Sequence, residues 1–286
     1  MANKFKDISI KYFVTNGTEY PIYNFKVYIE PQEFRKISGH RFVSLVMMDD
    51  TYRNDLQTLL GFIGRSPYIE NDYMKCGRIL ENPIITTAEK LYGIKVTKQN
   101  FGFEDLENGT DDYHFMRDLM FEDNGEEYVG EVKTFYNKQK LNWKGNDYPE
   151  PHLSWWLQTR LECEILNKKG RIFYYYVPKT SMEKVIGGKI DIKIKNLFQS
   201  DDIVPTDEPE PVIEEHLGHL GCQTFRDVMA FAEYRKFEME DDYYEDDDGG
   251  YYLVSVPIND AWWGKQNHVE KYIEEIKNYI TIEEIE

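Results

Sequence analysis

The sequence predicts an α/β protein, built on a mixed sheet flanked by helices and preceded by a β-rich segment. Three observations predict it. Short runs rich in Tyr, Phe, Val and Ile alternate with turn signals in the first 50 residues, as in antiparallel strands. Helical and strand-like patterns then alternate through the middle of the chain. Asn124-Gly125 stands between two apolar runs, and this dipeptide is typical of a tight hairpin.

The elements follow in order from these patterns. Strands are expected at 8–14, 25–29 and 42–46, and a helix at 52–62. A helix is expected at 74–92, broken or kinked near Pro83 and ended by Gly93. A strand is expected at 94–97, before the hairpin. The later expected elements are strands at 113–121, 127–135 and 171–177, a helix at 152–166, one or two short helices within 216–239, a strand at 251–257 and an amphipathic helix at 261–280.

The net charge of −18 is unevenly distributed. Residues 1–200 carry 28 acidic and 28 basic side chains, whereas residues 201–250 carry 17 acidic and 3 basic ones. Residues 151–200 are locally basic, with nine Lys or Arg against four Asp or Glu. Because phosphate binding depends on Lys and Arg, the acidity of one appendage leaves the neutral body compatible with a nucleic-acid enzyme.

Composition predicts a soluble cytoplasmic protein. The three cysteines are odd in number and far apart, which argues against a disulfide framework. No stretch approaches 18 uninterrupted apolar residues, so no membrane association is expected. We expect four regions: an N-terminal β-rich extension at 1–50, a core at 51–183, an acidic insertion at 184–249, and a closing strand and helix of the core at 250–286.

A candidate catalytic group lies at Glu131 and Lys133. Residues i and i+2 of a strand emerge on the same face, so a carboxylate and an ammonium point together from the second hairpin strand. Metal-assisted phosphodiester cleavage needs carboxylates for a hard cation and a group that orients or deprotonates water. Asp118 on the preceding strand, Glu81 in the earlier helix and the Gln158 amide in the later helix are candidates to complete such a site.

The order of these motifs resembles the lambda-exonuclease/YqaJ viral recombinase family, within the PD-(D/E)xK nuclease superfamily. Gly77-Arg-Ile-Leu-Glu81, followed by residues 88–96, looks like the helix of that family, and Asp118 followed by Glu131-Val-Lys133 looks like its metal-binding core. The Gln158 helix is similar to the one that carries the family's glutamine. The resemblance covers roughly residues 50–180 and 250–280.

The resemblance implies a restriction-endonuclease-like fold and a Mg²⁺-dependent DNA nuclease, with Mn²⁺ expected to substitute. Glu81, Asp118, Glu131 and the Val132 carbonyl would hold metal. Lys133 would orient or deprotonate the attacking water, and Gln158 would position it. The implied activity is 5′-to-3′ resection of double-stranded DNA ends by a ring-like homo-oligomer. It would supply strands to a single-strand annealing protein or recombinase in a bacterial or phage-infected cytoplasm.

The sequence departs from the family pattern in three places. The family's aspartate sits in Ser-Pro-Asp-Gly, but Asp118 sits in Met-Arg-Asp-Leu, so Asp111, Asp112 and Asp123 stay open as alternatives. Arg53 and Arg65 are the candidates for a phosphate-binding arginine. The insertion at 184–249 has no counterpart.

Two other functions fit the same sequence. One is a structure- or sequence-specific DNA endonuclease on the same core. The other is a non-enzymatic acidic protein that mimics DNA through residues 201–250.

Overall fold

The computed structural model describes residues 8–15, 18–28, 36–47, 71–102, 113, 116–137, 143–144, 148–243, 251–257 and 282–284. The chain divides into two compact units. One comprises 38–43 and 69–226, and the other takes the remaining N-terminal and C-terminal residues. The helices expected at 52–62 and 261–280 lie outside the described residues.

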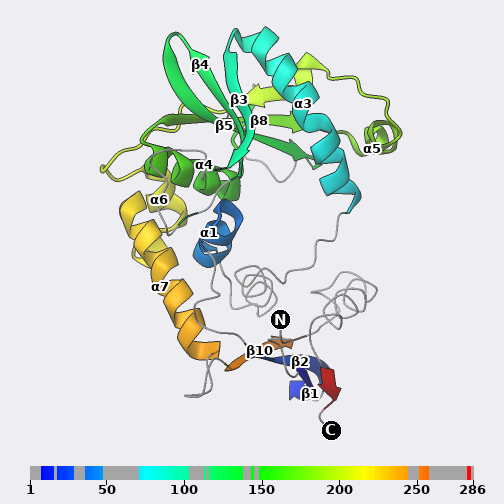
Figure 1. The fold of residues 1–286 in the computed structure, drawn as a ribbon, viewed down its shortest axis with the longest axis vertical. Coiled ribbons are helices and arrows are strands. Elements are labelled where there is room, and N and C mark those ends of the chain that lie inside the picture. Colours follow the sequence, from blue (N-terminus) through cyan, green and yellow to red (C-terminus); the bar gives the residue numbers. More distant parts are fainter. Residues whose placement is uncertain are drawn as a thin grey trace. The chain divides into compact units, whose positions relative to one another are not determined.

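The unit that contains 69–226 is built on a five-stranded sheet with the order β3-β4-β5-β8-β9 (Figure 1). In this sheet β5 and β8 pair in parallel, whereas the other neighbours are antiparallel. The predicted α/β class, a mixed sheet flanked by helices, is therefore confirmed. The strands are β3 (Lys95–Gly102), β4 (Met116–Asp123), β5 (Glu126–Phe135), β8 (Lys169–Tyr176) and β9 (Leu197–Gln199).

The hairpin between β4 and β5 forms at the predicted dipeptide. Asn124 and Gly125 both have positive φ, at 51° and 84°. A two-residue loop with positive φ at both positions matches the right-handed twist of the strands. The turn fixes a register in which Asp123 lies opposite Glu126 and Leu119 lies opposite Gly130.

Two helices pack on the sheet, α3 (Asp72–Tyr92) and α4 (Leu153–Leu166). The Asn71 side chain caps α3 by accepting from the Met74 amide at 2.9 Å, and Gly93 ends it in the left-handed conformation. The helix continues through Pro83 as one element, rather than ending there. The buried residues of α3 join one apolar cluster with Val132 of β5 and Phe173 of β8.

Two local predictions differ from the structure. Residues 42–46, expected as a strand, belong to the helix α1 (Gly39–Val46). Phe42 is fully buried, and its ring lies 5.8 Å from that of Phe225, so burial of a helical face explains the apolar run. The strand β9 was not predicted. It lies within the range 184–249 expected as an insertion, yet it pairs with β8 in the main sheet.

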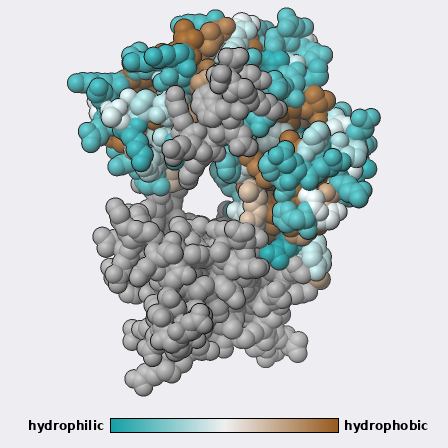
Figure 2. Space-filling model, turned by 180° about the vertical axis from the view of Figure 1, so that it is seen from behind, coloured by the Kyte–Doolittle hydropathy of each residue, from teal (hydrophilic) through white to brown (hydrophobic). Residues whose placement is uncertain are grey.

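The remaining described helices follow β8. They are α5 (Lys179–Ile186), a 3₁₀ turn η4 (Ile194–Asn196), α6 (Pro211–His216), a second 3₁₀ turn η5 (Gly218–Leu220) and α7 (Phe225–Tyr243). The last of them, α7, passes from one unit to the other at 226–227. Among the described residues, no helix is both long and apolar enough to cross a membrane. Where the view from behind is coloured, the surface is mostly hydrophilic, with smaller hydrophobic areas between (Figure 2).

The other unit contains a four-stranded sheet with the order β10-β2-β1-β11. Its strands are β1 (Ile8–Thr15), β2 (Thr18–Tyr28), β10 (Tyr251–Pro257) and β11 (Ile282–Glu284). The strand expected at 251–257 is present, but it pairs with β2 instead of closing the larger sheet. A short separate ladder joins β6 (Trp143–Lys144) and β7 (Tyr148–Pro149).

Candidate active site

The two faces of β5 differ in chemistry. Val132 points into the apolar cluster with α3, so the alternation of a strand directs Glu131 and Lys133 to the opposite face, where α4 lies. The hairpin register brings Asp118 of β4 beside Glu131. Gly130 permits this close packing, because a Cβ there would lie 2.7 Å from the Leu119 side chain.

Glu131, Lys133 and Gln158 form one hydrogen-bonded cluster. The Lys133 ammonium pairs with Oε1 of Glu131 and donates to Oε1 of Gln158 at 3.3 Å. The Gln158 amide donates through Nε2 to Oε1 of Glu131 at 2.9 Å. Glu131 is 2% exposed and Gln158 is 7% exposed. The structure therefore brings together three residues that the sequence places on a strand and a distant helix.

Asp118 joins this cluster through the backbone of β5. Its Oδ2 accepts a hydrogen bond from the Val132 amide at 2.6 Å. Burial raises the pKa of the Asp118 carboxyl well above its usual value, and the nearby charges of Glu131 and Glu81 raise it further. Glu81 on α3 is thus close enough to repel Asp118 electrostatically, so the three predicted carboxylates act on one region.

One alternative to Asp118 lies away from the cluster. Asp123 is at the hairpin end of β4 and forms an ion pair with Arg171. Asp111 and Asp112 are outside the described residues, as are the candidate phosphate ligands Arg53 and Arg65. Of the two candidate aspartates that the structure describes, Asp118 is the one beside Glu131.

Lys133 is a buried cation held by carboxylates. Burial lowers the pKa of its ammonium, but Glu131 and then Asp118 outweigh burial, so the pKa is raised above its usual value. Lys133 is accordingly protonated at neutral pH in this arrangement. A protonated Lys133 can donate hydrogen bonds to water or to a phosphate oxygen, but it cannot accept a proton.

Two further charged residues, which the sequence did not single out, lie next to the cluster. Glu162 stands one helical turn after Gln158 on α4, and Arg117 precedes Asp118; each is 1% exposed. Burial and then the Glu131 charge raise the pKa of Glu162, while Arg117 opposes the shift. Neither carboxylate oxygen of Glu162 has a hydrogen-bond partner within the described part of the chain. The i, i+4 spacing from Gln158 is the sequence signal that could have found Glu162.

The helix α1 also reaches the cluster. Desolvation of the His40 ring lowers its pKa, although the residue has exposed surface. The Lys133 charge lowers this pKa further, whereas the Glu131 charge raises it. Gly39 precedes it, and a Cβ at Gly39 would lie 2.8 Å from Cγ of Gln158. A side chain larger than hydrogen at position 39 would therefore displace the Gln158 amide. The prediction of a strand at 42–46 hid this contact.

The residues present fit a hard divalent cation by their chemistry. Glu81, Asp118 and Glu131 supply carboxylate oxygens, the ligands that Mg²⁺ and Mn²⁺ prefer. Oε2 of Glu131 is buried and has no hydrogen-bond partner among the described residues. Within those residues, however, no three Asp, Glu, His or Cys side chains converge tightly enough to hold an ion as they stand. Binding would therefore require these carboxylates to move closer together.

The basic residues at the start of β8 are neutralised by the chain itself. Lys168 and Lys169 pair with Glu127 and Glu126 of β5. Arg171 pairs with both Asp123 and Asp202. These ion pairs connect β8 to neighbouring elements, and they compete with any contact between these basic residues and a phosphate.

Comparisons with known proteins give similarity in structure. No family model matches the sequence, and no curated protein matches it. An alkaline exonuclease from Laribacter hongkongensis is similar at a TM-score of 0.45 and 13% identity, over 73% of this chain and 92% of that one. The structure of SSO0001 is similar at a TM-score of 0.34 and 13% identity, over 73% and 78%.

Proposed function

We propose that this protein is a Mg²⁺-dependent deoxyribonuclease. The observation that carries the proposal is the buried cluster of Glu131, Lys133 and Gln158, with Asp118 bonded to the same strand. Burying a carboxylate, an ammonium and an amide beside further acids costs folding free energy, and such clusters are typical of functional sites. Phosphodiester hydrolysis uses each of these groups.

Each residue has a part in this proposal. Glu81, Asp118 and Glu131, with the Val132 carbonyl, would hold the metal, which polarises the scissile phosphate and lowers the pKa of bound water. Lys133, kept protonated by its carboxylate neighbours, would donate to the attacking water or to a phosphate oxygen and stabilise negative charge in the transition state. Gln158 would orient the water through its amide.

Within this class we propose a 5′-to-3′ exonuclease acting on double-stranded ends. The proposal rests on the ordered motifs around Gly77, Glu81, Asp118, Glu131 and Gln158. Such an enzyme would work as a homo-oligomer and supply single strands to an annealing protein or recombinase. One assay separates it from its rivals, using linear and covalently closed circular duplexes of the same sequence with Mg²⁺.

Each outcome of that assay selects one function. Loss of the linear duplex with circles intact supports the exonuclease. Cutting of circles would replace it with an endonuclease on the same core. No cleavage of either substrate with Mg²⁺ or Mn²⁺ would contradict a nuclease and favour the acidic DNA mimic.

Lys133→Ala tests the mechanism. We expect cleavage to fall by about 10²- to 10⁴-fold, the range for loss of a group that acts in the transition state, while duplex binding is kept. Lys168→Ala is the matched control, because Lys168 is a lysine paired with a glutamate outside the cluster. Equal activity of the Lys133→Ala variant and the wild type would rule out the assigned role.

A further inference from the structure

A second group of basic residues follows β8, and it differs from the neutralised one. Residues 179–196, termed the lysine segment, span α5, the turn after it and η4. Its lysines are all exposed, and its acidic residues are Glu183 and Asp191. None of these lysines forms an ion pair with any residue that the structure describes. They are Lys179, Lys184, Lys189, Lys193 and Lys195.

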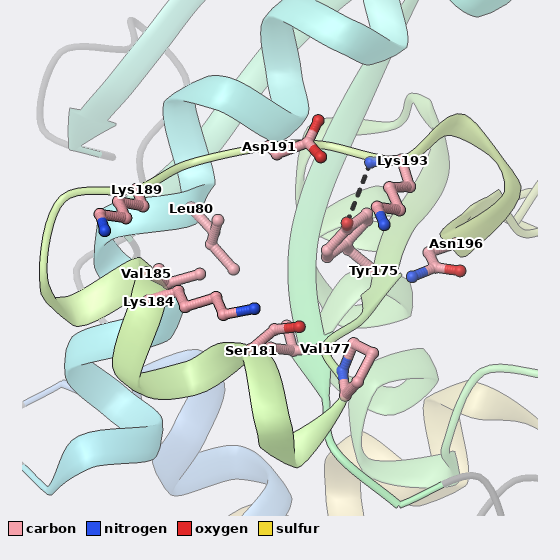
Figure 3. A pocket seen from close by; sticks show the side chains of 11 residues that line it. Leu80, Tyr175, Val177, Ser181, Lys184, Val185, Lys189, Asp191, Lys193 and Asn196 are labelled. Carbon is pink, nitrogen blue, oxygen red and sulfur yellow. Dashed lines mark hydrogen bonds between the residues drawn. The ribbon is translucent and has the colours of Figure 1, made fainter.

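A pocket of about 150 Å³ opens beneath this segment. Its apolar lining comes from Leu80 of α3, Val177 directly after β8 and Val185 of α5. Figure 3 shows the Lys184 side chain reaching across the pocket, and Lys193 beside the Tyr175 ring. The backbone amide of Lys193 donates to the Tyr175 hydroxyl at 3.1 Å, which ties the segment to β8.

The polar groups of the pocket suit an anion. Besides Lys184 and Lys193, the rim carries Lys189, the Ser181 hydroxyl and the Asn196 amide. Asp191 is the acidic residue among those that line it. Figure 3 shows the Lys189 ammonium turned away from the cavity, and the Asn196 amide donates to the Tyr176 carbonyl at 3.2 Å. Lys184 and Lys193, with the Ser181 hydroxyl, are therefore the groups of this pocket that fit a phosphate.

The pocket lies close to the catalytic cluster along the strands. Tyr175 is the cross-strand partner of Thr134, which follows Lys133 on β5. The pocket residues Leu80, Tyr175 and Val185 belong to the apolar cluster on the α3 face, whereas Lys133 faces α4. The pocket and the cluster are therefore at the same end of β5 and β8 but on opposite faces of the sheet, so a duplex would contact both around the end of these strands. On α3, Leu80 of the pocket directly precedes Glu81 of the proposed metal site.

We propose that the lysine segment binds the phosphate backbone of the duplex DNA on which the catalytic cluster acts, with one phosphate in the pocket between Lys184 and Lys193. The proposal rests on the function proposed above and adds the surface that holds its substrate. A chain with a net charge of −18 repels DNA at long range, so docking requires a local surface of cations that acidic side chains do not neutralise. Contacts by lysine to phosphate position a duplex without reading its sequence.

The test compares two double variants that remove the same charge. Lys184→Ala/Lys193→Ala removes two lysines of the pocket, whereas Lys168→Ala/Lys169→Ala removes two that are paired with glutamates. Binding of an end-labelled duplex is measured by fluorescence anisotropy with EDTA, over a series of salt concentrations. For the first variant we expect the slope of log K against log salt to decrease by about 2, and affinity at low salt to fall about tenfold. For the second we expect values within about twofold of the wild type.

The outcomes separate this proposal from the nuclease itself. Equal losses in both variants would mean that net charge alone controls binding, and wild-type binding by Lys184→Ala/Lys193→Ala would exclude the segment. In either case cleavage of linear duplex by the wild type leaves the nuclease standing. If the wild type does not cleave DNA but the two variants still differ as expected, the DNA-binding surface stands and the catalytic assignment fails. Thermal melting checks that both variants fold, which is expected since all four lysines lie at least partly in solvent.

Discussion

The two faces of the central strands β5 and β8 contrast sharply. Toward α3, the side chains form one apolar cluster that includes Leu80, Val132 and Phe173. Toward α4, β5 buries Glu131, which contacts Gln158 of α4, and two more buried charged residues lie nearby, Arg117 of β4 and Glu162 of α4. Elementary energetics favours the first face and penalises the second.

The α3 face stabilises the fold, whereas the α4 face carries the residues that we propose are catalytic. Arg160, also on α4, is buried as deeply as Glu162, but it pairs with Glu164 and Glu210 and donates to the Thr206 carbonyl. Glu162 and Oε2 of Glu131 lack such hydrogen bonds among the described residues. The chain can therefore satisfy a buried charge near this site, and the carboxylate oxygens without hydrogen bonds lie in the part that we propose binds a metal.

The largest effect on stability is expected on the apolar face. Phe173→Ala removes a fully buried ring that packs against Tyr92 and Phe121. We expect the free energy of unfolding to fall by about 3–5 kcal/mol, measured by urea denaturation. Phe237→Ala is the control, because Phe237 is 59% exposed and its loss should change stability by less than about 0.5 kcal/mol. If Phe173→Ala lowered the free energy of unfolding by less than about 1 kcal/mol, the α3 face would not be the main source of stability.

For Asp118→Asn we expect a gain in stability, the opposite of Phe173→Ala, together with a loss of activity. Cleavage should fall about 10²-fold or more, because a proposed metal ligand is lost. Without metal the variant should be more stable by about 1–2 kcal/mol at neutral pH, since the amide needs no proton to be neutral when buried, and its oxygen can still accept from the Val132 amide. Loss of stability in urea denaturation with EDTA would show that Asp118 is structural.

The pH dependence of Asp118 has a definite sign. Its folded-state pKa is raised, so the folded protein keeps a proton that the unfolded chain releases. Its contribution to wild-type stability is therefore present at acid pH and lost as pH rises above the usual carboxyl range. The Asp118→Asn variant should lack this part of the decline.

The smallest effect is expected for Gly39→Ala, which should disturb the Gln158 side chain alone. The new methyl group would contact Cγ of Gln158 at 2.8 Å and push its amide away from Glu131. We expect kcat to fall about tenfold, which corresponds to about 1.4 kcal/mol. Gly218→Ala is the matched control, because the nearest atom to a Cβ there is 4.0 Å away. Equal kcat values for the two variants would separate Gln158 from catalysis.

Local sequence signals predicted the parts of the site that depend on local structure. The Asn124-Gly125 turn sets the register of β4 and β5, and the two-residue period of a strand puts Glu131 and Lys133 on one face. The helix around Gln158 was also readable from its pattern. These three signals were enough to assemble most of the cluster.

The parts that failed depend on tertiary contacts. The apolar run at 42–46 is too short to separate a strand from one buried face of a helix, and packing of Phe42 against Phe225 favours the helix. The strand β9 has three residues, and its pairing with β8 defines it. The charges of Arg117 and Glu162 interact between β4 and α4, which the sequence does not reveal, although the i, i+4 spacing from Gln158 could have pointed to Glu162.

The parallel pairing of β5 with β8 also sets the order in which the protein can fold. The hairpin of β4 and β5 closes over two residues, so Asp118 and Glu131 can meet early. Lys133 pairs with Tyr174, much later in the sequence, and the intervening chain includes α4 with Gln158. Because closing such a long loop slows strand pairing, we expect the complete cluster to form in a late, slower step.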